Sequence, residues 1–229
     1  MSPSSHRSAA AVFESRIWAR GKRRFTILCL GAHADDIEIG CGGTVLRLLE
    51  TYHNRIDVWW VVFSSEGPRC REAKESASRF LRGTDHKTVL IKRYRGSYFP
   101  YQGKAMKDGF EALKPLCTPN VIFTHYRHDL HQDHRVINEL TWNTFRNHLI
   151  LEYEIPKYDG DLGAPNYFVH LNETHCRTKA EILLQCFKTQ RSKQWFSEDT
   201  FLSLARIRGI ESNAPRKFAE AFYCRKIIY

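Results

Sequence analysis

Apolar and polar positions follow each other along the chain in blocks whose lengths suit strands and helices in turn. Short apolar runs with the length of buried strands cover residues 27–32, 57–63, 88–91 and 120–124. A polar stretch and then apolar residues at helical spacing follow these runs. The helical stretches are expected after the glycines at 40–43 and over 69–81, 104–116 and 133–148. This order is typical of parallel strands joined by helices through right-handed crossovers.

The pattern is looser beyond residue 150. It predicts shorter strands at 152–155 and 167–171, helices at 178–187 and 200–208, and either a helix or a strand at 217–228. Residues 93–103 are rich in aromatic side chains and glycine and predict a loop over the ends of the strands. Neither a repeat nor a linker divides the sequence. We therefore expect one α/β domain, Rossmann-like, with a mostly parallel sheet flanked by helices over residues 25–229, preceded by a basic arm at 1–24.

Composition narrows the class of protein. The 229 residues and 42% hydrophobic content suit one domain with a full core. The net charge of +10 is compatible with nucleic acid, an anionic membrane surface or an anionic small substrate as partner. Most basic residues are scattered and nothing resembles a nucleic-acid platform, so we expect no nucleic-acid binding. The arm lacks a secretory signal, and no apolar run approaches the roughly 20 residues that span a bilayer. The arm could still contact an anionic leaflet peripherally.

The seven cysteines include no CxxC pair, and their odd number argues against a disulfide framework. A reducing, cytoplasmic location fits this usage best, and a zinc site made of thiolates alone is not expected. Cys41 is expected to be a small buried apolar residue. The exposed aromatic residues permit a homo-oligomer without requiring one.

Two clusters of imidazoles and carboxylates follow predicted parallel strands. The first is Ala32-His-Ala-Asp-Asp36, and the second is His125-Tyr-Arg-His-Asp-Leu-His-Gln-Asp-His134. Both can face the crevice at the carboxyl ends of the strands, where open α/β sheets bind ligands. The second cluster could instead be a solvated loop with Asp133 as a helix cap, but such a loop does not need four histidines.

Together the clusters predict metal-assisted hydrolysis. His33 and Asp36, with a histidine of His131-Gln-Asp-His134, could supply two nitrogens and one oxygen, a usual three-ligand set of catalytic zinc. Zinc lowers the pKa of a bound water toward about 7. Asp35, beside the ligand Asp36, could then accept the proton of that water.

Both clusters resemble motifs of the PIG-L/LmbE-type N-deacetylases, zinc-dependent enzymes that remove acetyl groups from N-acetylated amino sugars. The motif Ala-His-Pro-Asp-Asp-Glu, followed by Ile-Gly-x-Gly-Gly-Thr, stands at residues 32–44, with Ala34 and Ile37 in place of the proline and the acidic residue. The motif Asp-x-His-x-Asp-His stands at residues 129–134. Supporting matches are Arg69-x-x-Glu-Ala73, Gln190 with Trp195-Phe196, Ala205–Gly209 and Phe218–Phe222, whereas Cys186-Phe187 departs from the His or Tyr that members often carry there.

The resemblance, which covers about residues 25 to 225, implies a role for each matching residue. The expected zinc ligands are His33, Asp36 and His134. The expected catalytic groups are Asp35 as general base, His131 as the imidazole that stabilises the oxyanion or protonates the leaving amine, and Asp133, which would orient His131. Arg69 matches a substrate-contacting arginine, and His125 and Asp129 would support the ligands from outside.

The resemblance therefore implies hydrolysis of an N-acetyl amino sugar to acetate and a free amine, in glycan or glycoconjugate biosynthesis. The net charge mildly favours an anionic substrate that is phosphate-, nucleotide- or lipid-linked. Two alternatives stay open, namely a zinc amidase acting on a non-sugar or thiol-sugar amide, and a non-catalytic anion-binding module. The side chains of Lys92, Arg93 and Arg95 could neutralise a phosphate or simply be solvated. Those of Tyr94, Tyr98, Phe99 and Tyr101 could stack on a sugar or base, or pack a lid.

Overall fold

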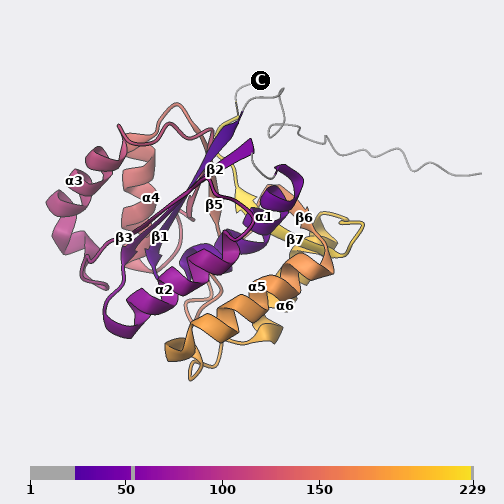
Figure 1. Cartoon of the computed structure of the whole chain (residues 1–229). Helices are drawn as coiled ribbons and strands as arrows, with labels where there is room; N and C mark the ends of the chain where they lie inside the picture. Colours follow the sequence, from indigo (N-terminus) through magenta and orange to yellow (C-terminus); the bar gives the residue numbers. More distant parts are fainter. Residues whose placement is uncertain (1–23, 53–54, 228–229) are drawn as a thin grey trace, which may run out of the picture.

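A computed structural model of the chain describes residues 24–52 and 55–227, which form a seven-stranded sheet with helices on both faces (Figure 1). The strand order is β3-β2-β1-β4-β5-β7-β6. The strands are β1 (Phe25–His33), β2 (Ile56–Ser64), β3 (Lys87–Ile91), β4 (Val121–His125), β5 (Leu149–Tyr153), β6 (Tyr167–Leu171) and β7 (Phe218–Tyr223). Strands β1 to β5 pair in parallel, whereas β7 is antiparallel to both β5 and β6. The expected α/β domain with a mostly parallel sheet is thus confirmed.

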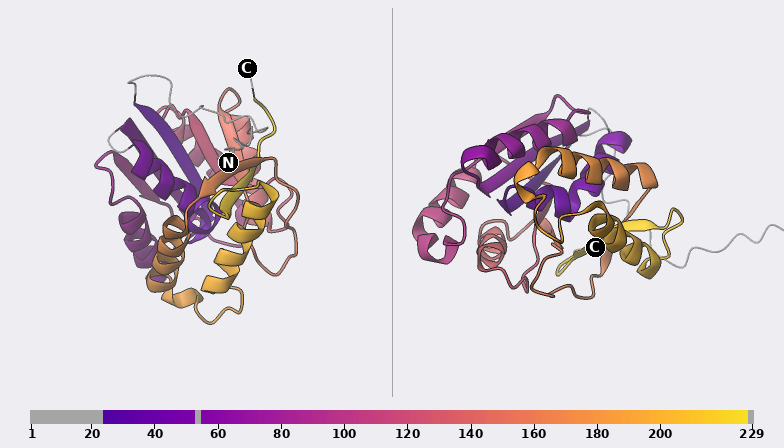
Figure 2. Two further views of the ribbon diagram at one scale, coloured as in Figure 1. Left: turned by 90° about the vertical axis from the view of Figure 1, so that its right-hand side faces the viewer. Right: turned by 90° about the horizontal axis from the view of Figure 1, so that it is seen from below.

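The helices form two outer layers around the sheet. They are α1 (Asp36–Tyr52), α2 (Gly67–Phe80), α3 (Gly103–Leu113), α4 (Gln132–Thr144), α5 (Glu173–Cys186) and α6 (Glu198–Glu211), with short 3-10 turns η2 (Phe99–Gln102) and η3 (Lys188–Gln190). Helices α3 and α4 lie on one face of the sheet, and α1, α2 and α5 lie on the other (Figure 1, Figure 2). In the described part of the chain, no helix is long and apolar enough to cross a membrane.

Strand β1 shows why the apolar runs are continuous. Ile27 and Cys29 belong to the core beneath α1, α2 and α5, whereas Leu28 and Leu30 belong to the core beneath α3 and α4. Because both faces of a parallel strand are covered, successive side chains on either face are apolar. The run of buried residues ends at His33, where the strand reaches the edge of the sheet.

The structure tests the elements predicted in the C-terminal part of the chain, but almost none of the N-terminal arm. The choice left open at 217–228 is decided as strand β7, and the expected strand at 152–155 only overlaps the end of β5. The basic arm, and with it the expected membrane contact, lies outside the described residues except for Arg24. The Arg24 guanidinium contacts Asp57 on β2 and His86, which directly precedes β3.

Helix α1 begins earlier than the sequence pattern indicated. We expected a polar loop through the glycines, but the helix begins at Asp36, and Gly40 and Gly43 are helical and buried. These glycines allow close packing, because a Cβ on Gly40 would overlap the ring of Tyr153, and one on Gly43 would lie 2.6 Å from Leu171. Helix α1 can therefore lie directly against the sheet.

A buried ion pair fixes the C-terminal third of the chain to helix α1. Glu220 on β7 accepts hydrogen bonds from the backbone N–H groups of Gly43 (2.9 Å) and Thr44 (2.6 Å). Lys179 on α5 donates to Glu220 (2.7 Å) and to the carbonyl of Ile39 (2.6 Å). A buried charge is tolerated when it is paired and hydrogen-bonded in this way. The Phe218–Phe222 segment thus has a structural role.

We predict that Gly40→Ala destabilises the fold. The added methyl group forces Tyr153 to move, and overpacking of this kind costs about 2 kcal/mol of unfolding free energy. Urea denaturation measures the change. Gly103→Ala is the matched control, because no neighbouring atom in the described part of the chain comes within 4 Å of its added Cβ. Equal stability of the two variants would contradict the packing role of Gly40.

Candidate active site and metal centre

The two clusters meet where the direction of strand addition reverses. Strand β1 lies between β2 and β4, so the chain builds outward from β1 to one side and then from β4 to the other. A crevice forms at such a switch point, outside the carboxyl ends of the strands. His33 ends β1 and His125 ends β4, and the cluster residues that follow them therefore face each other.

The turn between β1 and α1 is short and strained. Asp36 is the first residue of α1, and its Oδ2 accepts the backbone N–H of His33 at 2.6 Å. Between them, Asp35 has a φ of 101°, a conformation that side chains other than glycine rarely adopt. Strain of this kind persists where surrounding contacts fix it and is common at functional sites. The Arg69 guanidinium supplies such contacts, to the carbonyl of Ala34 and to Asp35 Oδ1 at 3.1 Å.

Three ligand-type atoms form a nearly equilateral triangle. His33 Nδ1 lies 3.3 Å from His134 Nε2 and 3.5 Å from Asp36 Oδ2, and His134 Nε2 lies 3.6 Å from Asp36 Oδ2. Zinc bonds of about 2.0–2.1 Å at tetrahedral angles place ligand atoms roughly 3.3–3.4 Å apart. The three expected ligands thus fit a zinc ion in both chemistry and spacing, and they leave room for a fourth ligand.

Two buried carboxylates hold the imidazole ligands from outside. Asp133 Oδ2 bonds His33 Nε2 at 2.9 Å, which leaves Nδ1 of that ring as the ligand atom. Asp129 Oδ2 bonds His134 Nδ1 at 2.9 Å, which leaves Nε2 as the ligand atom. Carboxylates in this position fix the tautomer and orientation of a metal-bound histidine.

The charges at this point favour a cation. Burial alone would lower the pKa of His33, but Asp133 and Asp36 raise it to about 9. Burial would raise the pKa of Asp36, yet the facing imidazoles of His134 and His125 hold it well below its usual range. The negative potential that stabilises a proton on His33 also stabilises a divalent ion. Burial and His125 lower the pKa of His134 to about 3, so this ring is neutral, as a metal ligand must be.

His131 lies beside the triangle as a neutral hydrogen-bond donor. It is the N-cap of α4, and its Nδ1 accepts the backbone N–H of Asp133 at 3.2 Å. The proton of the neutral ring is therefore on Nε2. Burial, together with the charge of His33, lowers the pKa of His131 and keeps the ring neutral. Its ring stacks 4.5 Å from that of His134, between ring centroids.

Of Asp35, Asp36, Asp129 and Asp133, Asp35 alone accepts no backbone N–H through its carboxylate from the described residues. It is buried, and burial raises its pKa to about 6, although the charge of Arg69 opposes the rise. A carboxylate with a pKa near neutrality is suited to accept and return a proton. Arg69 was expected to contact substrate, and the structure adds that it binds Asp35.

Two expectations about hydrogen bonds need correction. Asp133 was expected to orient His131 or to cap a helix, but its carboxylate holds His33 and His131 itself is the cap. The other oxygen contacts of Asp133 are the backbone N–H groups of Ser97 (2.5 Å) and Phe99 (3.2 Å). The expectation failed because the loop at 93–103 brings donors to Asp133 from far along the chain.

This loop does cover the site, as expected, and its aromatic residues divide into two groups. Phe99 is buried and stacks against His33 with ring centroids 5.9 Å apart, and Tyr94 packs edge-on against Phe99. Tyr98 and Tyr101 are 41% and 78% exposed and remain accessible. Phe99 and Tyr94 therefore pack the lid, whereas the choice between lid packing and ligand contact stays open for Tyr98 and Tyr101.

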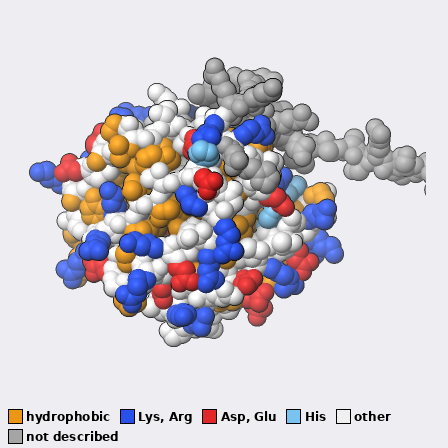
Figure 3. Space-filling view, in the orientation of Figure 1, with side chains coloured by type: hydrophobic (Ala, Val, Ile, Leu, Met, Phe, Trp, Pro, Cys, Tyr) orange, Lys and Arg blue, Asp and Glu red, His pale blue; other side chains and the backbone are white. Residues whose placement is uncertain are grey.

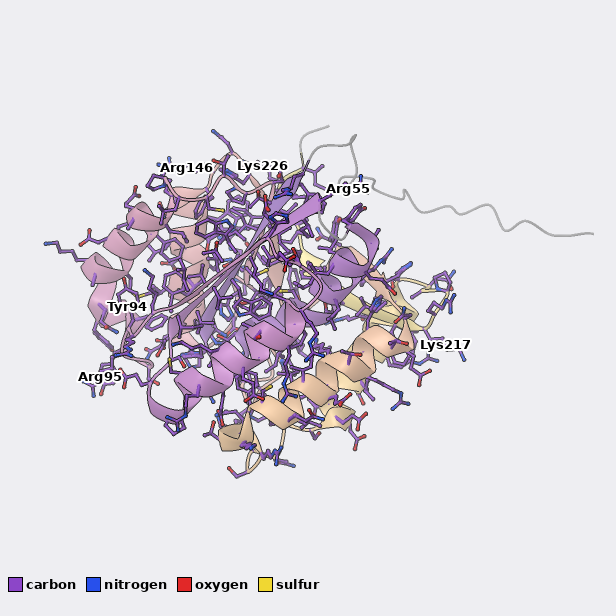
Figure 4. All side chains as sticks on the ribbon, in the orientation of Figure 1. Arg55, Tyr94, Arg95, Arg146, Lys217 and Lys226 are labelled. Atoms are coloured by element: carbon purple, nitrogen blue, oxygen red, sulfur yellow. The ribbon has the colours of Figure 1, made fainter. Side chains whose placement is uncertain are left out.

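The basic side chains shown in Figure 3 and Figure 4 lie in several separate places. On the face shown in Figure 3, Lys and Arg side chains are interspersed with Asp and Glu. Figure 4 shows Arg95 near Tyr94, after β3, whereas Arg55, Arg146 and Lys226 lie toward the opposite end of the sheet. The Arg95 guanidinium lies 3.7 Å from the centre of the Tyr98 ring, a cation–π contact. Among these residues, only Arg95 is placed near the strand ends that carry the site.

Two further residues, His125 and Lys157, contact the site carboxylates from outside, and the sequence suggested only the first of them. His125 is fully buried, accepts the backbone N–H of Ala32 at 2.9 Å and lies 3.2 Å from Asp36 Oδ2. That role was expected, but Lys157, 3.1 Å from Asp129, was not. Lys157 lies in the irregular segment between β5 and β6 and belongs to no motif, so no sequence pattern could have identified it.

Comparison with known proteins identifies the family of this chain. The sequence profile of the PIG-L family, described as GlcNAc-PI de-N-acetylase, matches residues 28–145. The chain belongs to this family.

Solved structures with the same fold are distant in sequence. The conserved protein TT1542 from Thermus thermophilus is 19% identical, with a TM-score of 0.69 over 89% of this chain and 96% of its own. The N,N'-diacetylchitobiose deacetylase from Pyrococcus horikoshii is 21% identical, with a TM-score of 0.63 over 87% and 83%. The 4-carboxy-2-hydroxymuconate hydratase GalB from Pseudomonas putida is 14% identical, with a TM-score of 0.70 over 90% and 98%. At these identities the likeness establishes the fold.

We predict that His134→Ala abolishes stoichiometric zinc binding. The substitution removes one corner of the ligand triangle and leaves Asp129 without its imidazole partner. Elemental analysis of protein dialysed against trace zinc measures the bound metal. His128→Ala is the control, since His128 is exposed on the same loop. Full zinc occupancy in His134→Ala would exclude this ligand set.

Proposed function

We propose that this protein is a zinc-dependent hydrolase that removes the N-acetyl group of an N-acetylated amino sugar. Water and the amide give acetate and a free amine. The observation that carries the proposal is the triangle of His33, Asp36 and His134, with a proton acceptor and a proton donor beside it. Membership of a family described as a de-N-acetylase supports the same reaction.

The chain's own groups divide the reaction between them. Asp35 accepts a proton from the attacking water, as its raised pKa of about 6 allows. His131 donates its Nε2 proton in a hydrogen bond to the carbonyl oxygen as that oxygen becomes negative. Asp35 then returns the proton to the departing nitrogen, so that acetic acid and a free amine form. At neutral pH the remaining acid proton passes to the amine, which gives acetate and an ammonium group. A bound zinc ion supplies a lowered water pKa and polarises the carbonyl.

The substrate is proposed to carry a negative group. Arg95 and Tyr98 extend from the loop that covers His33, and their cation–π pair presents an aromatic face and a positive charge together. An aromatic face suits the apolar side of a sugar ring, and a guanidinium suits a phosphate. A phosphate-, nucleotide- or lipid-linked amino sugar satisfies both.

The fold by itself does not select this reaction. A hydratase shares it with a TM-score of 0.70, and metal, base and donor are also useful for adding water to other bonds. Acetate release from a panel of free, nucleotide-linked and phospholipid-linked N-acetylhexosamines decides between the reactions. Wild-type protein that binds zinc but releases no acetate from any of them would favour the other candidates, an amidase of different scope or a binding module.

We predict that Asp35→Asn keeps zinc but loses most turnover. The amide cannot accept the proton of water, and loss of a general base typically costs about 10²–10⁴-fold in kcat. Asp35 does not belong to the ligand triangle, so zinc content should equal that of wild type. Measuring both quantities on the same preparation tests the role. Undiminished turnover would exclude Asp35 as the base.

We predict that His131→Ala lowers kcat by about 10²–10³-fold, the usual effect of removing one oxyanion donor. The donor acts on charge that develops in the transition state, so KM should change little. Steady-state kinetics with the best substrate of the panel measures the effects on kcat and KM separately. An effect confined to KM would indicate that His131 only binds the ground state.

A further inference from the structure

The irregular segment 154–166, between β5 and β6, contacts the metal centre through a lysine. The Lys157 side chain is only 9% exposed, and its Nζ lies 2.5 Å from Asp161 Oδ2 and 3.1 Å from Asp129 Oδ2. Each of these carboxylates is buried beside it, with 8% and 3% of its side chain exposed. One ammonium group thus compensates two carboxylates in a place from which water is largely excluded.

Asp129 connects this ammonium to both halves of the reaction centre. Its Oδ2, which faces Lys157, also bonds Nδ1 of the metal ligand His134 at 2.9 Å. Its Oδ1 accepts the backbone N–H of His131 at 2.8 Å. The position of this one carboxylate therefore sets the orientation of a ligand ring and of the backbone that carries the proposed oxyanion donor.

Asp161 closes the arrangement from the other side. Its Oδ2 accepts the backbone N–H of Leu130 at 2.7 Å as well as the Lys157 ammonium. Leu130 lies between Asp129 and His131 in the sequence, so this bond ties the segment 154–166 to the same loop. Without the ammonium, the Asp129 and Asp161 carboxylates would face each other with no cation between them, and one of them would move away or take up a proton.

The ends of the segment have anchors of their own. Arg208 on α6 bonds Glu154 at 2.6 Å and the carbonyl of Gly163 at 3.0 Å. Tyr223 on β7 donates to Glu154 at 3.1 Å. A change at Lys157 is therefore expected to act locally, on Asp129, and to leave the path of the chain at both ends in place.

We propose that Lys157 is a positioning residue of the metal centre, which holds Asp129 against His134 and His131 by compensating the charges of Asp129 and Asp161. This role depends on the metal site proposed above. Lys157 touches neither metal nor substrate in it, and it acts only through Asp129.

Zinc affinity measured by competition with a chromophoric chelator tests the role without any turnover. Outer partners of metal-bound histidines typically contribute 10–100-fold in affinity, and we expect Lys157→Met to lose about that much. Asp161→Asn keeps the ammonium and should lose far less. The double variant Lys157→Met/Asp161→Asn should bind zinc more tightly than Lys157→Met alone, because only one carboxylate then lacks its cation.

Asp159→Asn is the matched control. Asp159 lies in the same segment, 3.8 Å from the Lys157 ammonium, but it is 41% exposed, so zinc affinity should equal that of wild type. Thermal melting of each metal-free variant distinguishes a weakened metal site from a loss of folding. If Lys157→Met does not fold, the zinc affinities of Asp161→Asn and the double variant are compared, and the double variant should bind zinc more weakly.

The outcomes are distinct. Wild-type affinity in Lys157→Met, or a double variant that is no tighter than Lys157→Met, would overturn the role of Lys157 and leave the proposed function standing. If Lys157→Met does not fold, the double variant is compared with Asp161→Asn instead. Equal zinc affinity of these two variants would then overturn the role of Lys157 as well. Wild-type protein that binds no zinc would overturn both proposals.

Discussion

The compensation of negative charge in a buried place is the constraint on which this site depends. The carboxylates of Asp35, Asp36, Asp129 and Asp133 all lie within the protein, around the rings of His33 and His134. Each is costly to bury unless a cation or several hydrogen-bond donors face it. The structure supplies Arg69 for Asp35, Lys157 for Asp129, and backbone N–H groups for Asp133. Asp36 faces the imidazoles of His33, His125 and His134, and with His33 and His134 it could hold a metal ion.

Tight packing of helix α1 against the sheet makes this concentration of buried charge possible. Helix α1 lies against the sheet through its glycines, and the Lys179–Glu220 pair bonds the backbone of the same helix from the far side. Tyr153, which packs under Gly40, donates to the carbonyl of Leu30 at 2.7 Å and lies 3.3 Å from His125 Nε2. Packing therefore holds the elements that carry the candidate metal-binding side chains in place before a metal or substrate binds. Electrostatic catalysis needs such preorganisation.

Local backbone geometry gives neighbouring residues of the same type different roles. Asp36 begins a helix and faces the ligand triangle, whereas Asp35, one residue earlier, has a positive φ and faces Arg69. His134 lies inside α4 and is held by Asp129, whereas His131 caps that helix and carries its proton on Nε2. Since a hydratase shares this fold, the chemistry resides in such side-chain arrangements more than in the fold.

The sequence by itself determined the layered α/β fold, the strands that end at the site, and the candidate ligands, base and donor. Hydrophobic periodicity and the position of polar clusters at strand ends are local properties, and the motifs at 32–44 and 129–134 are contiguous. Only the tertiary structure decided that α1 begins at Asp36, that Asp133 holds His33, and that Lys157 supports Asp129. Each of these depends on contacts between residues far apart in the sequence, such as a tyrosine beneath a glycine or a loop that folds over a strand end. Such contacts leave no periodic pattern, because they arise from how finished elements pack together.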